Sequence, residues 1–227
     1  MQIIYLAFFY LLGSIPVAWL IGKLAGRGDI RRLGSGNAGV MNVALNVSRW
    51  AGLIVFLAEI AKGVLTVLLA QKWQLNEAMT SLAVLVAVAG TRWSIWIRGS
   101  GGRGNTLGVA ALLVLSWPSV AIGGAVWVAA RILTKSSFWA TRCWLLSLPI
   151  SLGLATMSWW YAAMGAALGL FYLSEHKTGT DDHTILKETW PSLWAFLTAP
   201  RRRKQAKQEE NRDPLFHPDV HDGSGKS

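Results

Sequence analysis

This chain has few cysteines and few histidines, the residues that form disulfides and many metal sites. Its 227 residues include one cysteine, Cys143, which excludes an internal disulfide and a multi-cysteine metal site. The four histidines all follow residue 175, and their spacing matches no common metal motif; they are His176, His183, His217 and His221. We therefore expect neither a metal nor another cofactor.

Acidic residues are almost missing from the first three quarters of the chain. Residues 1–174 hold 13 Lys and Arg against three acids, whereas residues 175–227 hold nine of each kind. The net charge of +10 therefore belongs to residues 1–174. A basic tail would have suggested nucleic acid as a partner. Because the tail is neutral, the charge instead predicts loops that face anionic lipid or an anionic substrate.

Hydrophobic residues are abundant, at 52% of the chain, with 13 Trp and a mean hydropathy of +0.37. This composition is too apolar for most soluble domains and predicts a polytopic membrane protein. Apolar runs long enough to cross a bilayer occupy residues 2–22, 50–70, 79–97, 106–130 and 143–173.

The charges of the loops predict how these runs cross the membrane. Five Lys and Arg between residues 23 and 49 place that loop in the cytoplasm and the N-terminus outside. Two more basic stretches, residues 92–103 and 131–142, also belong inside, so the run between them must enter and return near Pro118. Divided into 143–156 and 157–173, the last run completes an all-α fold. We expect a polytopic integral membrane protein of about seven transmembrane or half-membrane helices, with a cytoplasmic C-terminus.

The chain is expected to divide into a membrane domain of residues 1–178 and a cytoplasmic tail of residues 179–227. Within the tail, residues 189–197 are predicted to form an interfacial amphipathic helix. From Gln205 onward we expect disorder.

The stretch from Gly34 to Asn42 reads Gly-Ser-Gly-Asn-Ala-Gly-Val-Met-Asn. Glycines at this spacing let backbone N–H groups converge on an anion, and the Ser and Asn side chains can add donors. This pattern predicts a phosphate cradle at a membrane surface, made of Gly34, Ser35, Gly36, Asn37, Gly39 and Asn42. An ordinary turn between helices is the alternative.

A second loop combines arginines with glycines: Arg92, Arg98 and Arg103 lie beside Gly99, Gly101, Gly102 and Gly104. Arginine binds phosphate through two parallel hydrogen bonds, and glycines allow close backbone approach. A loop that only sets membrane orientation would explain the charge but not four glycines within six residues.

Three further charged residues are candidates for a role in the site. Glu59 and Lys62 are spaced i and i+3 within a predicted span, so they can pair on one helix face, either for function or to fasten two helices. His176 follows the last apolar run and could be a general base or an interfacial anchor.

Five short motifs follow one another in a fixed order: Gly13–Pro16, Asp29–Arg31, Gly34–Gly39, Lys62-Gly63 and Gly101–Gly104. In order and spacing they resemble the bacterial acyl-phosphate:glycerol-3-phosphate acyltransferase family, over about residues 1–178. The resemblance implies a seven-helix, multi-pass enzyme of the bacterial inner membrane with cytoplasmic active-site loops. It also implies transfer of a fatty acyl group from acyl phosphate to glycerol 3-phosphate in phospholipid synthesis, giving lysophosphatidic acid and phosphate without a metal.

The resemblance and the residue chemistry together define the expected site. Catalytic roles are expected for Ser35, Lys62, Arg103 and His176. Substrate binding is expected for Gly34, Gly36, Asn37, Gly39, Asn42, Arg49, Gly101, Gly102 and Gly104. The expected partners are acyl phosphate, glycerol 3-phosphate and membrane lipid, with no nucleic acid.

The chain also departs from the family pattern on the acceptor side. Arg103 stands where the family has a Lys, Leu45 where it has a substrate-binding Arg, and Gly179 where it has an Asn. Further departures are Met41 for a Thr, Glu59 for an Asp and Thr91 for a His. Arg49, four residues and thus one helical turn after Leu45, is expected to supply a substitute charge. The alternative function is a non-catalytic or re-specified membrane protein that binds a phosphorylated lipid or metabolite; a transporter is disfavoured.

Overall fold

The structure, a computed structural model, describes residues 2–175 and 193–198, and these residues are helical or loop, without strands. The chain separates into two units, residues 1–182 and 183–227. The second unit contributes one described helix, α10 (Leu193–Thr198). It overlaps the amphipathic helix predicted for residues 189–197, whose first four residues lie outside the described residues.

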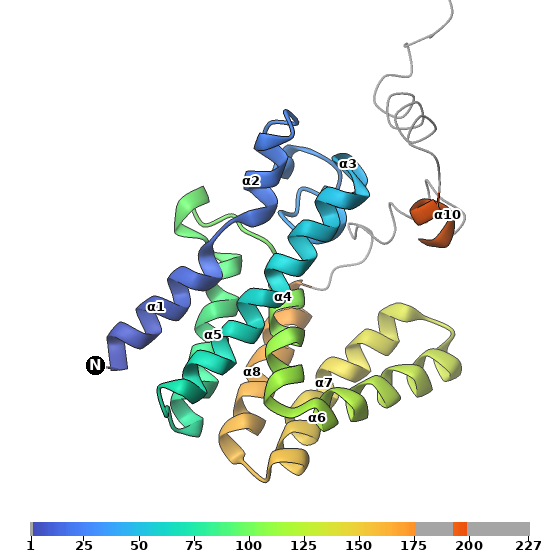
Figure 1. The fold of residues 1–227 in the computed structure, drawn as a ribbon. Coiled ribbons are helices and arrows are strands. Elements are labelled where there is room, and N and C mark those ends of the chain that lie inside the picture. Colours follow the sequence, from blue (N-terminus) through green and yellow to red (C-terminus); the bar gives the residue numbers. More distant parts are fainter. Residues whose placement is uncertain (1, 176–192, 199–227) are drawn as a thin grey trace, which may run out of the picture. The chain divides into compact units, whose positions relative to one another are not determined.

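The first unit is a bundle of helices (Figure 1). In chain order these are α1 (Gln2–Ser14), α2 (Val17–Leu24), the short η1 (Ile30–Arg32), α3 (Val40–Asn46), α4 (Arg49–Lys72), α5 (Glu77–Arg92), the short η2 (Ile95–Ile97), α6 (Asn105–Thr134), α7 (Ser137–Thr156) and α8 (Trp159–Glu175). Within the described residues, five segments are long and apolar enough to cross a membrane: Gln2–Leu24, α4, Glu77–Ile97, α6 and α7. The all-helical membrane fold predicted from the sequence is confirmed.

Polar side chains mark where two of the long helices begin. The Ser48 hydroxyl accepts a hydrogen bond from the Ala51 N–H at the start of α4, and the Asn76 side chain accepts one from the Met79 N–H at the start of α5. Such caps satisfy backbone donors that have no partner inside the helix. Ser48 also separates α3 from α4, because its backbone is extended.

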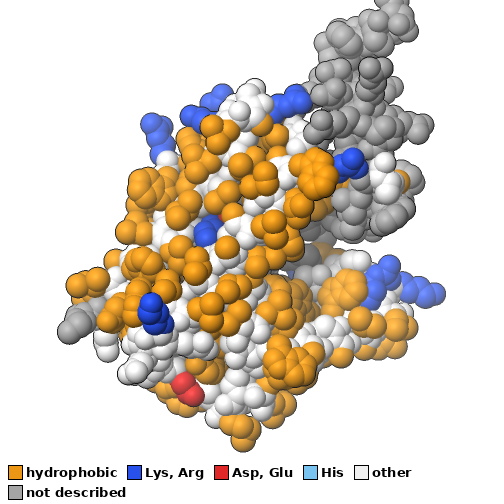
Figure 2. All heavy atoms as spheres, in the orientation of Figure 1, with side chains coloured by type: hydrophobic (Ala, Val, Ile, Leu, Met, Phe, Trp, Pro, Cys, Tyr) orange, Lys and Arg blue, Asp and Glu red, His pale blue; other side chains and the backbone are white. Residues whose placement is uncertain are grey.

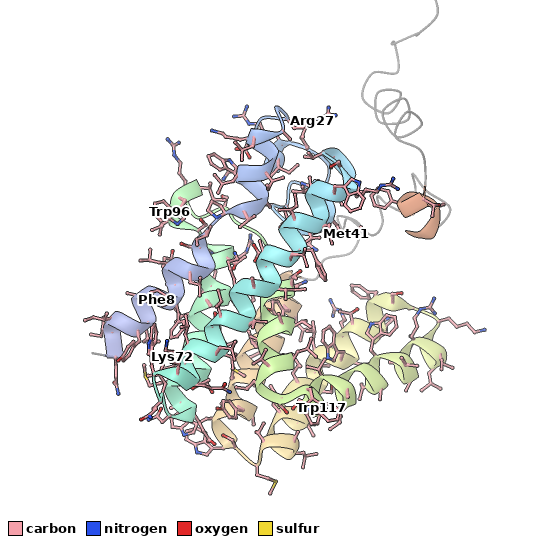
Figure 3. All side chains as sticks on the ribbon, in the orientation of Figure 1. Phe8, Arg27, Met41, Lys72, Trp96 and Trp117 are labelled. Carbon is pink, nitrogen blue, oxygen red and sulfur yellow. The ribbon has the colours of Figure 1, made fainter. Side chains whose placement is uncertain are left out.

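Two spans are broken. The first span divides at Ile15–Pro16 into α1 and α2. The helix α6 bends at Ser116, whose φ and ψ of −158° and 85° are not helical, two residues before Pro118. Proline lacks the N–H that would continue the helix, and its ring clashes with the preceding turn. Figure 3 labels Trp117 at this bend, after which the second half of α6 runs beside α7.

The bend lies where the sequence predicted that the run 106–130 would turn, and α7 and α8 divide at Met157–Ser158, close to the predicted boundary. The predicted loop of residues 131–142 is wrong, because α6 continues to Thr134 and α7 begins at Ser137. Lys135, with φ 53°, makes the turn almost alone. The basic residues of this stretch therefore lie mostly on the ends of two helices.

The main core is formed by α4 to α8. It includes Val67, Val84, Leu107, Leu148 and Leu168, all almost completely buried. The helix α1 packs on α5 through two glycines that leave no room for a side chain: Gly13 faces the Ala87 backbone, and Gly90 faces Tyr10 and Ser14. Close approach of this kind is typical of helices packed in membranes.

Large apolar side chains also cover the outside of the bundle (Figure 2), including Leu57 and Leu65 of α4 and Leu146 and Ile150 of α7. Lys and Arg gather at the end that carries α2 and α3 and at the tip of the α6–α7 hairpin. Figure 3 shows Arg27 and Lys72 at opposite ends of the bundle. An apolar belt between polar ends is the surface that a bilayer requires.

Candidate functional site

The break between α1 and α2 leaves backbone carbonyls without a helical partner inside a membrane span. The Lys62 ammonium, on α4, donates to the Gly13 carbonyl at 3.0 Å and to the Ile15 carbonyl at 3.1 Å. It also pairs with Glu59 at 2.7 Å. All three ammonium protons therefore have an acceptor, and both side chains are buried. The predicted Glu59–Lys62 pair exists, and it fastens α4 to the broken helix.

The same break is held from the side of α5 and the loop after it. The Thr91 hydroxyl donates to the Gly13 carbonyl at 3.0 Å, and the Ser94 hydroxyl donates to the Ser14 carbonyl at 2.5 Å. The Trp96 indole N–H donates to the Ser14 hydroxyl at 3.0 Å. The break thus joins two segments that lead to the glycine-rich loops: α2, which precedes the first loop, and residues 94–96, which precede the second.

The side chain of Asn42, on α3, holds the backbone of the first glycine-rich loop through hydrogen bonds. The Asn42 side-chain NH2 group donates to the carbonyls of Ile30, Leu33 and Asn37, at 2.8–3.0 Å. Its carbonyl oxygen accepts from the Asn46 side chain at 2.7 Å. Asn42 is fully buried, so the structure places it under the loop and not on the loop surface.

Arg31 links the first loop to the second. Its guanidinium pairs with Asp29 at 2.6 Å and donates to the Ile97 carbonyl at 2.8 Å. The hydrogen bond and charge of Arg31 lower the pKa of Asp29 to about 2 and raise that of Arg31. The ion pair is therefore fully formed at neutral pH and holds the two loops side by side.

In the second loop, Gly101 and Gly102 are sites of close backbone packing. The Gly101 N–H donates to the Arg92 carbonyl at 2.8 Å, and a Cβ on Gly101 would meet the Thr91 carbonyl. A Cβ on Gly102 would lie 2.5 Å from the Ala38 carbonyl oxygen. The backbones of the two glycine-rich loops are therefore in direct contact.

A polar cavity of about 450 Å³ opens where the two loops meet. Its lining comes from both loops and from the end of α5: Asp29, Arg31, Arg32, Gly36, Asn37, Arg92, Ser100 and Gly101. The lining contains three arginines and one carboxylate, Asp29, whose charge Arg31 already neutralises. The cavity therefore carries a net positive charge. Arginine and exposed backbone together are suited to a phosphate group.

A second cavity is apolar and lies between α4 and the first half of α6. It measures about 390 Å³ and is lined by Phe56, Ile60, Val64, Asn105, Thr106, Val109, Ala110, Leu113 and Val114. Asn105 comes four residues after Gly101, which lines the polar cavity. The segment Gly101–Asn105 thus connects a positive cavity to an apolar groove in a membrane span.

The structure brings some of the predicted site residues together. Gly36, Asn37 and Gly101 line the polar cavity, and Ser35 directly precedes Gly36, its Oγ accepting from the Asn37 N–H at 3.4 Å. The other loop glycines occupy the two touching loops; they are Gly34, Gly39, Gly102 and Gly104. Arg103 is half-buried beside Gly104, the residue before α6. His176 lies outside the described residues.

Two expectations change with the structure. Arg49 is not one helical turn beyond Leu45, because Leu45 lies on α3, Arg49 begins α4, and the extended Ser48 lies between them. The expectation is wrong because Ser48 caps the start of a new helix, so residues 45–49 are not one continuous helix. Lys62 is not among the residues lining either cavity; its ammonium faces Glu59 and the α1–α2 break.

Sequence reasoning did not assign Arg32 and Ser100, which line the polar cavity, to the site. The run Arg31-Arg32 directly before the glycines could have indicated Arg32 as a phosphate-facing cation. Ser100 carried no such signal. The apolar groove was also missed, since its residues are indistinguishable in sequence from other lipid-facing positions.

The fold and the two cavities together define a polytopic membrane protein with a basic, glycine-lined cavity beside an apolar groove. The family model described as "Glycerol-3-phosphate acyltransferase" matches residues 3–182. The chain belongs to this family of enzymes.

Several proteins similar to this chain are named glycerol-3-phosphate acyltransferase. A protein from Prochlorococcus marinus (strain MIT 9312) is 40% identical over a match that covers 52% of this chain and 59% of the relative. A protein from Synechococcus sp. (strain CC9902) is 34% identical over 85% of this chain and 95% of the relative. The match therefore spans little more than half of the first relative and nearly all of the second.

Two solved structures share the fold. Both are of PlsY, described as an integral membrane glycerol 3-phosphate acyltransferase. The glycerol 3-phosphate form has a TM-score of 0.66 at 23% identity, over 77% of this chain and 88% of the solved one. The lysophosphatidic acid form has a TM-score of 0.65 at 21% identity, over 83% and 92%. These likenesses support the integral membrane fold.

Proposed function

We propose that this protein is a membrane acyltransferase that moves a fatty acyl group from acyl phosphate to glycerol 3-phosphate, giving lysophosphatidic acid and inorganic phosphate in phospholipid synthesis. The observation that carries the proposal is the pairing of a positive cavity with an apolar groove. A substrate with a phosphate at one end and a fatty chain at the other has the chemistry of this pair of cavities.

Each of the two loops binds a different substrate. The first loop, with Ser35, Gly36, Asn37 and Gly39, offers donors to the acyl-phosphate group. Arg103 of the second loop, with His176 beyond α8, serves the acceptor. The apolar groove holds the acyl chain. Because Lys62 is committed to the α1–α2 break, its role is to support both loops and not to contact the acceptor.

The reaction requires no enzyme-bound intermediate. The acceptor hydroxyl oxygen forms a bond to the acyl carbon, and the bond from that carbon to the phosphate oxygen breaks, so that phosphate leaves with the electron pair. The hydroxyl proton passes to a base, for which His176 is the candidate in the sequence. Phosphate is a good leaving group, so the enzyme contributes positioning and charge stabilisation by arginine and backbone N–H groups.

The proposal places both loops at the cytoplasmic face of a bacterial inner membrane, following the excess of positive charge at that end of the bundle (Figure 2). A reporter fused after Arg32 and one fused after Lys135 should both be cytoplasmic. Opposite locations would contradict this topology.

The central test is transfer itself. Purified protein in detergent or lipid cubic phase is given acyl phosphate and labelled glycerol 3-phosphate, and labelled lysophosphatidic acid is measured. Arg103→Ala should weaken the apparent affinity for glycerol 3-phosphate roughly ten- to a hundredfold, and the affinity for acyl phosphate much less. Neither Arg98 nor Arg103 is among the residues that line the two cavities, so Arg98→Ala, which removes an equal charge from the same loop, serves as the matched control.

Equal losses for both substrates in Arg103→Ala would reject the division between the two loops. No transfer by the unmodified protein, combined with binding of phosphorylated ligands, would favour the alternative of a re-specified or non-catalytic binding protein. The departures at Leu45 and Gly179 are the sequence features behind that alternative.

A further inference from the structure

The helix α8 contacts both ends of the second loop. At the start of the loop, the Phe171 ring packs edge-on against Trp93, with ring centroids 5.7 Å apart. At its end, the Tyr172 hydroxyl donates to the Gly104 carbonyl at 3.1 Å. Two consecutive residues of one helix therefore bracket the segment Trp93–Gly104, which carries Arg98 and Arg103.

The contact of Tyr172 is buried and directional. Tyr172 is 8% exposed, and the Gly104 carbonyl that it meets also accepts the Gly108 N–H at 2.9 Å. Gly104 itself has φ 72°, a left-handed conformation that favours glycine, and it immediately precedes α6. The carbonyl is thus held from two sides at the residue that follows Arg103.

Gly108 gives independent support for this contact. Glycine inside a helix is unfavourable relative to alanine, so its presence one turn into α6 needs a reason. A Cβ at this position would collide with the Tyr172 hydroxyl, and the nearest ring carbon would be 3.2 Å away. The hydroxyl group, more than the ring, is what requires glycine here.

We propose that Tyr172 is a positioning residue for Arg103. By fixing the Gly104 carbonyl it sets the direction in which the preceding residue, Arg103, presents its guanidinium to the acceptor phosphate. This inference rests on the proposed function.

The test is a double-mutant cycle read out by steady-state transfer. Tyr172→Phe should raise the KM for glycerol 3-phosphate roughly three- to tenfold, the effect of one lost neutral hydrogen bond, while the KM for acyl phosphate changes less than about twofold. Gly108→Ala should have a larger effect and lower kcat/KM at least about tenfold, because its Cβ meets the Tyr172 hydroxyl. In Gly108→Ala/Tyr172→Phe the collision is gone, so activity should return to near the Tyr172→Phe level. Tyr161→Phe, on the same helix, is the matched control.

Stabilisation by ligand distinguishes a failure of the proposed function from a failure of the positioning role alone. The melting temperature of each variant is measured with and without glycerol 3-phosphate. A wild type that neither transfers nor gains stability from glycerol 3-phosphate would overturn the proposed function, and the inference with it. A wild type that does both, with Tyr172→Phe unchanged in KM, would overturn the positioning role alone. Additive losses in the cycle, or equal changes in both KM values, would also overturn it.

Discussion

The two glycine-rich loops are alike in composition but use their glycines for different physical reasons. In the first loop, Gly36 has φ 74° and lines the polar cavity, and a Cβ on it would come no closer than 3.4 Å to a neighbour. In the second, Gly101 and Gly102 have ordinary backbone angles but lie directly against other backbone carbonyls. A glycine motif can therefore mark either an open surface or a tightly packed junction, and Gly102 of the second loop is the glycine that packs against the first loop.

The largest effect should come from a change that supports both loops at once. Lys62→Met leaves Glu59 buried without its partner and frees the carbonyls of Gly13 and Ile15, a loss of about 3–5 kcal/mol. We expect a large fall in the melting temperature in detergent and loss of ligand binding by both loops. Lys72→Met, at the exposed end of the same helix, should change little.

The double variant Glu59→Leu/Lys62→Met sharpens this prediction. It removes the stranded carboxylate, so it should be more stable than Lys62→Met alone. A melting temperature for Lys62→Met equal to that of the wild type would show that the pair does not support the break.

The next largest effect is expected for Gly102→Ala, which should force the two loops apart. Its Cβ would lie 2.5 Å from the Ala38 carbonyl oxygen, and a backbone atom cannot move aside as a flexible side chain can. Overpacking of this kind costs about 1–3 kcal/mol. We expect reduced thermal stability and weaker binding of both substrates. Stability within error of the wild type would mean that the loops can shift apart without cost.

Gly36→Leu tests the open surface of the first loop. Gly99 supplies a matched control because it has φ 72°, with nothing within 4 Å of a Cβ, and does not line the polar cavity. Both leucine variants should lose about 1–2 kcal/mol of stability from the left-handed backbone. Only Gly36→Leu should also lose acyl-phosphate binding, measured by titration of the folded protein. Equal binding losses would mean that strain, and not blockage of the cavity, is responsible.

The smallest effect concerns pH. The pKa of Asp29 is lowered from 3.8 to about 2 in the folded protein, so its ion pair with Arg31 stabilises the fold fully above about pH 4. That contribution should be lost as the pH falls from 4 towards 2. The wild type should therefore unfold at a higher temperature than Asp29→Asn at pH 6, and the difference should shrink on acidification. A constant difference would show that Arg31 does not act through this pair.

Much of the fold could be predicted because strong local signals coincide with its breaks. Pro118 cannot continue a helix, and apolar runs of sufficient length locate the spans. The break at Pro16 was not predicted, because residues 2–22 were expected to form one span. The sequence predicted a loop over residues 131–142 and not the tight turn at Lys135, because no glycine or proline marks a turn there. Its charged neighbours suggested a loop, yet basic side chains at helix ends can reach the polar interface while their backbone stays helical.

The site was less predictable because several polar residues have roles set by tertiary contacts. The sequence indicated Asn42 as a possible phosphate donor, whereas in the structure its side chain holds three loop carbonyls. The roles of Arg31 and Tyr172 depend on partners 66 and 68 residues away in the chain. No local pattern encodes such distances.

The apolar groove between α4 and α6 has a consequence for substrate choice. Its length from Asn105 to Val114 spans about 14 Å at 1.5 Å per residue. Phe56 and Leu113 on its walls are 40% and 48% exposed, so the groove opens sideways to the surroundings of the bundle. A closed tunnel limits the length of a bound acyl chain because its closed end blocks longer chains. Under the proposed function, this open groove has no closed end, so the bilayer accommodates the remainder of the acyl chain. Acyl-phosphate donors of different chain lengths should therefore be accepted alike.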